Sequence, residues 1–129
     1  MSANKEKLSI LIVDDYKTML KIIRNLLGQL GFNKVEEATD GAMALQKMQE
    51  QHFDLIISDW NMEPMSGLDL LKQTRANDNY RRVPFIMVTA ESKPANVIAA
   101  KEAGVSNYIV KPFNAATLKE KLVSVLGNF

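Results

Sequence analysis

The sequence contains no cysteine, and this absence removes three classes of chemistry. Zinc fingers, structural disulfides and thiol catalysis all require cysteine side chains. An excess of charge of one sign is also missing, because 16 Lys and Arg residues face 15 Asp and Glu residues and leave a net charge of +1. The chain as a whole therefore has no strong electrostatic attraction to nucleic acid or to a membrane surface.

Long apolar runs are missing as well. No stretch approaches the roughly 18 apolar residues of a transmembrane helix, and residues 1–7 lack the apolar core of a signal peptide. We therefore expect a cytoplasmic protein with no membrane partner. The length suits one domain spanning residues 1–129, without a separate output domain. Apolar residues make up 47% of the chain, which is enough for a core without disulfides.

Strand-like and helix-like segments alternate along the whole chain. Short apolar runs predict strands at 8–13, 53–58, 83–89 and 107–110, and a short strand with a weaker pattern is expected at 34–37. Apolar residues at helical spacing predict helices around 19–30, 41–48, 68–71, 94–103 and 118–126. In the fourth of these helices we expect Val97, Ile98 and Ala100 to face inward. Five such units predict an α/β fold with a parallel sheet covered by helices on both faces, because parallel neighbours need crossover connections.

Polar side chains lie at the carboxyl ends of four of the five expected strands. Asp14 and Asp15 follow the first, Asp59 follows the third, Thr89 ends the fourth and Lys111 follows the fifth. The strand order must reverse somewhere if both faces are covered, and ligands bind at that reversal, beyond the carboxyl ends of the strands. Three acids facing one lysine must protonate or bind a cation. Oxygen ligands completed by water and phosphate favour Mg²⁺, and an Asp carboxylate beside the metal can act as a nucleophile and form an acyl phosphate.

Each of these residues also has an ordinary structural explanation. An Asp after a strand is usually a turn or N-cap residue, and Lys111-Pro112 alone indicates only a turn. The coincidence of four strand ends favours the functional interpretation. Nucleotide binding is disfavoured, because the chain has neither G-x-x-x-x-G-K-[ST] nor G-x-G-x-x-G after its first strand.

Four motifs, in order, resemble those of response-regulator receiver domains, and most closely those of the single-domain chemotaxis members. They are Val13-Asp14-Asp15, Ser58-Asp59-Trp60-Asn61-Met62, Val88-Thr89-Ala90-Glu91 and Tyr108-Ile109-Val110-Lys111-Pro112-Phe113. The resemblance covers residues 8–126. It implies a flavodoxin-like (βα)5 fold with a five-stranded parallel sheet in the order 2-1-3-4-5. That strand order follows from the resemblance and not from the alternation of strands and helices in the sequence.

The resemblance implies a role for each matching site residue. Asp59 matches the phosphoacceptor. Asp15, Asp59 and the backbone carbonyl of Asn61 match the direct Mg²⁺ ligands, and Asp14 matches the acid that acts through metal-bound water. Lys111 matches the lysine that contacts the phosphoryl group.

Further matches concern the switch and its output. Thr89 and Tyr108 match the switch pair, in which the threonine turns toward the phosphoryl group and the tyrosine moves inward. Asn61 and Glu91 match positions that tune autodephosphorylation. The resemblance implies an output surface that contains Lys93, Val97, Tyr108, Phe113 and Lys121.

The function implied by the resemblance is that of a chemotaxis response regulator. Asp59 would receive a phosphoryl group from a histidine kinase, and phosphorylation would switch binding to the flagellar motor switch. A phosphatase is a further expected partner, the protein is expected to be a monomer, and it would catalyse only its own phosphorylation and dephosphorylation. A phosphate sink or a phosphorelay intermediate without motor binding is the alternative.

Two functions from other classes fit the sequence less well. A phosphatase of the haloacid dehalogenase type needs a second acid two residues after its nucleophile, where this chain has Asn61. A flavin carrier needs a phosphate-cradling loop after Val13, which is missing.

The chain departs from the family pattern at two places. Met62-Glu63-Pro64 replaces the usual Met-Pro, and we expect Glu63 to affect the site only weakly. Pro94 begins the fourth helix, in the output region, and leaves the choice of partner open. The Lys111–Pro112 bond matches one that is cis in the family.

Overall fold

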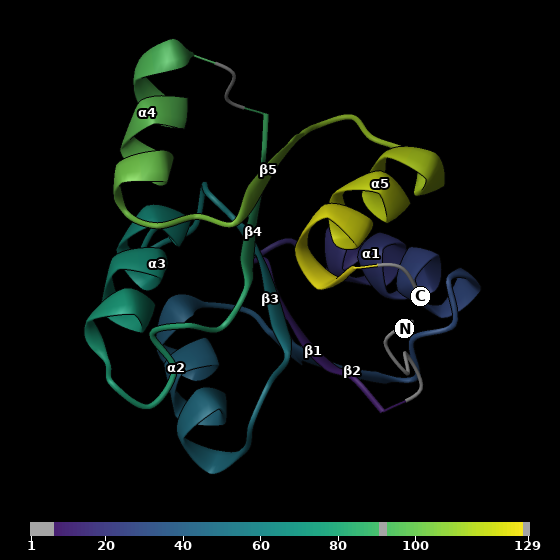
Figure 1. Cartoon of the computed structure of the whole chain (residues 1–129), viewed down its shortest axis with the longest axis horizontal. Helices are drawn as coiled ribbons and strands as arrows, with labels where there is room; N and C mark the ends of the chain where they lie inside the picture. Colours follow the sequence, from purple (N-terminus) through teal and green to yellow (C-terminus); the bar gives the residue numbers. More distant parts are fainter. Residues whose placement is uncertain (1–6, 91–92, 128–129) are drawn as a thin grey trace.

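Five parallel strands form a single sheet in the computed structural model, which describes residues 7–90 and 93–127 (Figure 1). The strands run in the order β2-β1-β3-β4-β5, and every neighbouring pair is parallel. This confirms the flavodoxin-like order expected from the resemblance. The strands are β1 (Ser9–Val13), β2 (Lys34–Ala38), β3 (Leu55–Asp59), β4 (Phe85–Thr89) and β5 (Asn107–Val110).

Helices cover both faces of the sheet, with α1 and α5 on one face and α2, α3 and α4 on the other (Figure 1). Three of them begin at a side chain that accepts a backbone N–H: Asp40 caps α2, Ser66 caps α3 and Asn114 caps α5. Pro94 stands in the first turn of α4, where backbone N–H groups have no partner within the helix, so the N–H that proline lacks costs no helical hydrogen bond. The helices are α1 (Lys17–Gln29), α2 (Gly41–Glu50), α3 (Gly67–Ala76), α4 (Pro94–Glu102) and α5 (Ala115–Leu126).

The core has two layers, one on each face of the sheet. Successive strand residues point to opposite faces, so Ile10 and Ile57 pack beneath α1 and α5, whereas Leu11 and Ile56 pack beneath α2 and α3. All four side chains are fully buried. Burial on both faces explains why the three central strands β1, β3 and β4 are rich in apolar residues, whereas the edge strand β2 has exposed charged residues.

One expected core residue is on the surface. Ile98 was expected to face inward with Val97 and Ala100, but 55% of its surface is exposed. Ala100 is fully buried, and Val97 lies one helical turn before it on the same face. Ile98 is only two positions from Ala100, about 200° around the helix, and therefore points away from the sheet.

The order in which strands are added to the sheet reverses after β2, because β2 lies on one side of β1 and β3 lies on the other. β1 pairs with β2 on one side and with β3 on the other, so the carboxyl ends of β1 and β3 flank the reversal. β3 was expected to end at Ser58, but it extends to Asp59, which pairs with Val88. The Trp60 N–H continues that ladder by donating to Val88 O over 3.2 Å. Asp59 is thus the last strand residue and not a loop residue.

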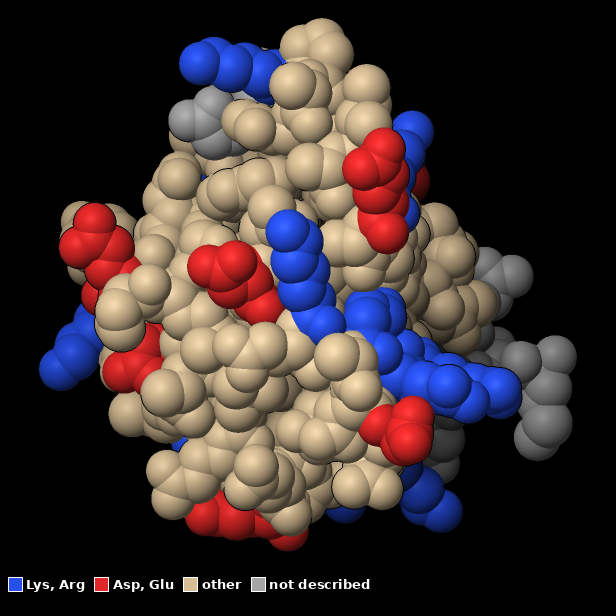
Figure 2. Space-filling model, turned by 90° about the vertical axis from the view of Figure 1, so that its left-hand side faces the viewer, with Lys and Arg blue, Asp and Glu red and all other residues tan. Residues whose placement is uncertain are grey.

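Charged side chains of both signs are interspersed among uncharged ones on the face covered by α2, α3 and α4 (Figure 2). None of the helices in the described part of the chain has the length and apolar character that crossing a bilayer requires.

Candidate functional site

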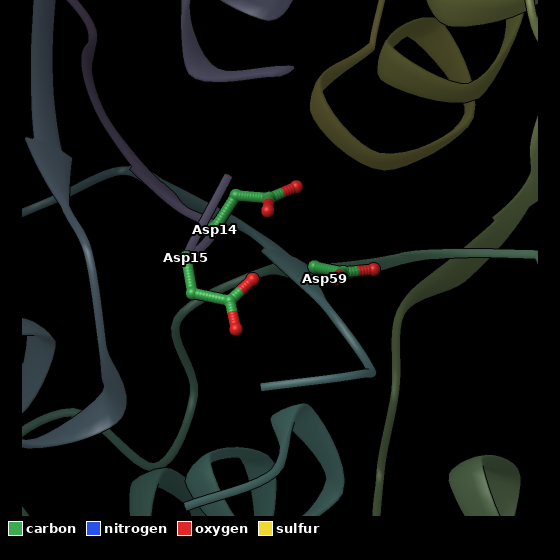
Figure 3. Close-up of side chains that lie close together, drawn as sticks. All are labelled: Asp14, Asp15 and Asp59. Atoms are coloured by element: carbon green, nitrogen blue, oxygen red, sulfur yellow. The ribbon is translucent and has the colours of Figure 1, made fainter. Parts of the chain in front are cut away.

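Asp14, Asp15 and Asp59 meet at the carboxyl edge of the sheet (Figure 3). Each offers one carboxylate oxygen, and these three atoms lie within 4.8 Å of one another. Asp14 is held directly after β1, because its N–H donates to Ala38 O on β2 over 3.1 Å. The acids that the sequence places after the first and third strands therefore come together as expected.

The three acids differ in burial, which the sequence did not indicate. Asp14 and Asp59 are 1% and 6% exposed, whereas Asp15 is on the surface. Burial raises the pKa of Asp14 from 3.8 to about 6, because its charged form loses water. The Tyr16 N–H, which donates to Asp14 Oδ1 over 2.9 Å, lowers that pKa, and the charge of Asp59 raises it further. Burial also raises the pKa of Asp59.

Lys111 supplies the positive charge at this edge. Its Nζ lies 3.2 Å from Asp59 Oδ1, to which it donates, and 3.7 Å from Asp14 Oδ2. The lysine is positioned by its own N–H, which donates to Thr89 O over 2.8 Å. Its bond to Pro112 is cis, as the resemblance implied, and a second cis bond joins Glu63 to Pro64. Lys111 favours the ionised form of Asp59 and opposes the rise in its pKa.

One oxygen of the cluster lacks a donor. Asp14 Oδ2 is buried and has no hydrogen-bond partner among the described residues. A buried carboxylate oxygen without a donor is costly unless a cation or a water molecule satisfies it. Three carboxylate oxygens at this spacing, with one charge balanced by Lys111, fit a hard divalent cation with oxygen ligands, such as Mg²⁺.

The expected switch residues lie on β4 and β5, the two strands that follow β3 in the sheet. Thr89 is the buried last residue of β4 and pairs with Val110 of β5. Tyr108 is half-buried on β5, and its ring meets that of Trp60 edge-on, with centroids 6.3 Å apart and planes at 69°. Asn61 follows Trp60 and is exposed. Glu91 lies outside the described residues.

The residues expected on the output surface are distributed over α4, β5 and α5. Lys93 precedes α4, Val97 lies within it, and Lys121 lies on α5. Phe113 follows β5 and packs against the core layer beneath α1 and α5. Tyr108 packs against the opposite layer, so the two aromatic side chains lie on different faces of the sheet.

A model of the response regulator receiver domain matches residues 10–123 of this chain. The chain belongs to this family. Chemotaxis protein CheY-3 of Vibrio cholerae is 52% identical over 117 residues, which are 91% of this chain and 90% of the relative. Chemotaxis protein CheY of Pseudomonas aeruginosa is 48% identical over 118 residues, which are 92% and 95% of the two chains. This receiver domain is therefore of the chemotaxis type and belongs among the response regulators of two-component systems.

Solved structures lead to the same family. CheY4 of Vibrio cholerae superposes with a TM-score of 0.87 and 38% identity, covering 92% of this chain and 98% of the other. The receiver domain of a sensor histidine kinase from Pseudomonas aeruginosa superposes with a TM-score of 0.84 and 30% identity, covering 94% and 98% of the two chains. That domain holds a magnesium ion in its active-site cleft.

Proposed function

We propose that this receiver domain is a phosphorylation switch in chemotaxis. Asp59 accepts a phosphoryl group from a histidine kinase, and the phosphorylated form binds the flagellar motor switch. The observation that carries the proposal is the position of the Asp59 carboxylate, which shares the reversal of the sheet with Asp14 and Asp15 and bonds Lys111 over 3.2 Å. This arrangement supplies a nucleophile, a cation site and a countercharge in one place.

The transfer step follows from these positions. A carboxylate oxygen of Asp59 attacks the phosphorus of a phosphohistidine, the P–N bond breaks, and the imidazole leaves with the bonding electrons and takes up a proton. Such a transfer depends on positioning and charge neutralisation more than on covalent chemistry. Asp15, Asp59 and the carbonyl of Asn61 would hold Mg²⁺, with Asp14 acting through bound water. When bound, the ion would neutralise negative charge on the carboxylates and on the phosphoryl oxygens.

Lys111 has two tasks in this proposal. Before transfer, it holds the nucleophilic carboxylate in place and favours its ionised form. After transfer, its ammonium group moves from the carboxylate oxygen to a phosphoryl oxygen, which carries more negative charge. The backbone N–H of Lys111 is bonded to Thr89 O, so the residue that contacts the phosphoryl group is anchored at the end of β4.

The switch connects that end of β4 to β5. The Thr89 hydroxyl turns toward the phosphoryl group, and Tyr108 on the neighbouring strand moves inward. These differential contacts shift a pre-existing equilibrium toward the active state. The surface formed by α4, β5 and α5 then binds its partner through residues that include Lys93, Val97, Tyr108, Phe113 and Lys121.

A titration with a peptide from the flagellar motor switch protein tests the output. We expect the phosphorylated protein to bind the peptide more tightly than the unphosphorylated protein does. Equal affinity of the two forms, together with efficient draining of phosphoryl groups from the kinase, would establish a phosphate sink or phosphorelay intermediate instead. Recruitment of a phosphatase, the monomeric state and the cytoplasmic location stay predictions.

The chemical nature of the product has its own test. An acyl phosphate on Asp59 is cleaved by neutral hydroxylamine, whereas a phosphate ester of serine or threonine is not. Under this proposal the domain catalyses only its own phosphorylation and dephosphorylation, and residues Asn61 and Glu91 set a short lifetime. Phosphorylated protein that stays intact for hours with Mg²⁺ present would contradict that lifetime.

A further inference from the structure

The peptide group between Asp59 and Trp60 is bonded at both of its polar atoms. The Trp60 N–H donates to Val88 O over 3.2 Å, and the Asp59 carbonyl accepts from the Ser58 hydroxyl over 2.9 Å. Ser58 is fully buried, so this bond is shielded from competing water. The orientation of this peptide helps to set the direction in which the Asp59 side chain leaves the backbone.

Gly67, the first residue of α3, also lies close to this carbonyl. A Cβ at position 67 would lie 2.9 Å from the Asp59 carbonyl carbon and 2.9 Å from Met87 Sδ, and it would overlap the Asp59 carbonyl oxygen. The Gly67 N–H also donates to Trp60 O over 2.8 Å. Only a residue without a side chain lets α3 begin this close to the backbone of Asp59.

We infer that Ser58 and Gly67 are positioning residues for phosphoryl transfer to Asp59, an inference that rests on the proposed function. They act through the carbonyl of Asp59 and touch neither the phosphoryl group nor the metal. Each has an ordinary explanation alone: a buried serine needs a partner for its hydroxyl, and glycine occurs at helix starts. Their convergence on one carbonyl oxygen is what indicates a shared role in fixing the nucleophile.

The consequence is kinetic, because the reacting oxygen must be aligned with the phosphorus. A misplacement of about 1 Å costs on the order of 10²-fold in rate. The segment also leads to Asn61, whose carbonyl is a proposed metal ligand, so a shift at Asp59 should weaken Mg²⁺ binding as well. Ser58 and Gly67 should therefore affect transfer and metal affinity in protein that is fully folded.

Two variants test the inference, with Mg²⁺ alone and acetyl phosphate as the probes. In Gly67→Ala we expect labelling by acetyl phosphate to slow on the order of 10²-fold and the Kd for Mg²⁺ to rise. In Ser58→Ala the loss of one buried hydrogen bond should slow labelling roughly three- to tenfold. Fluorescence of Trp60, the only tryptophan of the chain, reports Mg²⁺ binding beside Asp59. Urea unfolding shows that each variant is folded under the conditions of the assay.

Matched controls come from the same chain. At Gly28, on α1, an added Cβ meets nothing within 4 Å, so Gly28→Ala controls for Gly67→Ala. Thr74 is a buried residue whose hydroxyl donates to Leu70 O over 2.8 Å, away from the acids, so Thr74→Ala controls for Ser58→Ala. Both controls should keep the wild-type labelling rate and Mg²⁺ affinity, even where their stability changes.

The outcomes separate this inference from the proposed function. If Asp59 of the wild type is not labelled, both are wrong. If it is labelled, and folded Ser58→Ala and Gly67→Ala match their controls in rate and in Mg²⁺ affinity, only the positioning role is wrong. Should Gly67→Ala fail to fold, the comparison of Ser58→Ala with Thr74→Ala decides.

Discussion

Lys111 Nζ lies 3.2 Å from Oδ1 of Asp59, across a separation of 52 residues in the sequence. The same ammonium group lies 3.7 Å from Oδ2 of Asp14, so one cation is shared by two buried carboxylates. One ammonium group cannot neutralise both carboxylates, so the cluster keeps a net negative charge that fits a divalent metal ion. The lysine also competes with such a metal ion, since both are attracted by the same oxygens.

Replacing Lys111 by methionine separates these two effects. Lys111→Met keeps most of the stem and removes the charge, so we expect Mg²⁺ to bind several-fold more tightly. In the absence of metal the carboxylates lose their partner, and the free energy of unfolding at pH 7 should fall by about 1–2 kcal/mol. Titration by Trp60 fluorescence and urea unfolding measure the two quantities. The exposed Lys101 on α4 provides the control Lys101→Met, and an unchanged or weaker Mg²⁺ affinity in Lys111→Met would contradict the competition.

The raised pKa of Asp14 predicts how stability depends on pH. Because this pKa rises from 3.8 to about 6 on folding, the folded protein holds more protons than the unfolded chain between those values. The free energy of unfolding should therefore fall as the pH rises through this window. Asp14→Asn removes the cost of the buried charge and should stabilise the metal-free protein at pH 7 by on the order of 2 kcal/mol, with little gain at pH 4. Urea unfolding at several pH values tests this, and an equal gain at pH 4 and pH 7 would rule it out.

The same pKa predicts competition between protons and Mg²⁺. A protonated carboxyl binds a divalent cation poorly, so the affinity for Mg²⁺ should be highest above pH 7 and should fall as the pH drops through about 6. Isothermal titration calorimetry between pH 5 and pH 8 measures this dependence. An affinity that stays constant over that range would show that Asp14 does not titrate with the metal site.

Glu63 should matter little for the metal, although it lies four residues after Asp59. Its side chain is exposed, and the acidic group whose oxygens meet contains Asp14, Asp15 and Asp59 but not Glu63. We expect Glu63→Ala to change the Kd for Mg²⁺ by less than about tenfold, or roughly 1.4 kcal/mol. A larger change would mean that the loop after β3 brings Glu63 to the ion.

The edge-on contact between Trp60 and Tyr108 provides an optical readout of the switch. If phosphorylation moves Tyr108, the surroundings of the indole change, and with them the emission of the only tryptophan. We expect a smaller change in Tyr108→Leu, and also in Thr89→Ala, where no hydroxyl turns toward the phosphoryl group. Emission spectra before and after phosphorylation test this. Equal emission changes in the wild type and both variants would show that Tyr108 is not coupled to the site.

The sequence predicted the fold and the meeting of the acids for a simple physical reason. Parallel strands place their carboxyl ends at one edge, so the alternation put Asp14, Asp59 and Lys111 at the same edge. The strand order that brings them close came from the family resemblance. The difference between Asp14 and Asp15 could not be predicted in this way. It depends on how the chain turns after β1, where the Tyr16 N–H binds the Asp14 carboxylate.

The packing of helices against the sheet could not be predicted from the sequence either. Ile98 was assigned to the core by its apolar character, whereas its angular position on α4 exposes it. The close approach of Gly67 to the Asp59 carbonyl depends on where α3 begins relative to β3.

The proposed function requires that Asp59 accept a phosphoryl group with the help of Mg²⁺. Incubation with acetyl phosphate, followed by intact-mass measurement and peptide mapping, measures this step. We predict one added phosphoryl group on the wild type, located in the peptide that contains Asp59, and none on Asp59→Asn or when EDTA removes the metal. Equal incorporation into Asp59→Asn, or labelling that does not need Mg²⁺, would contradict the account.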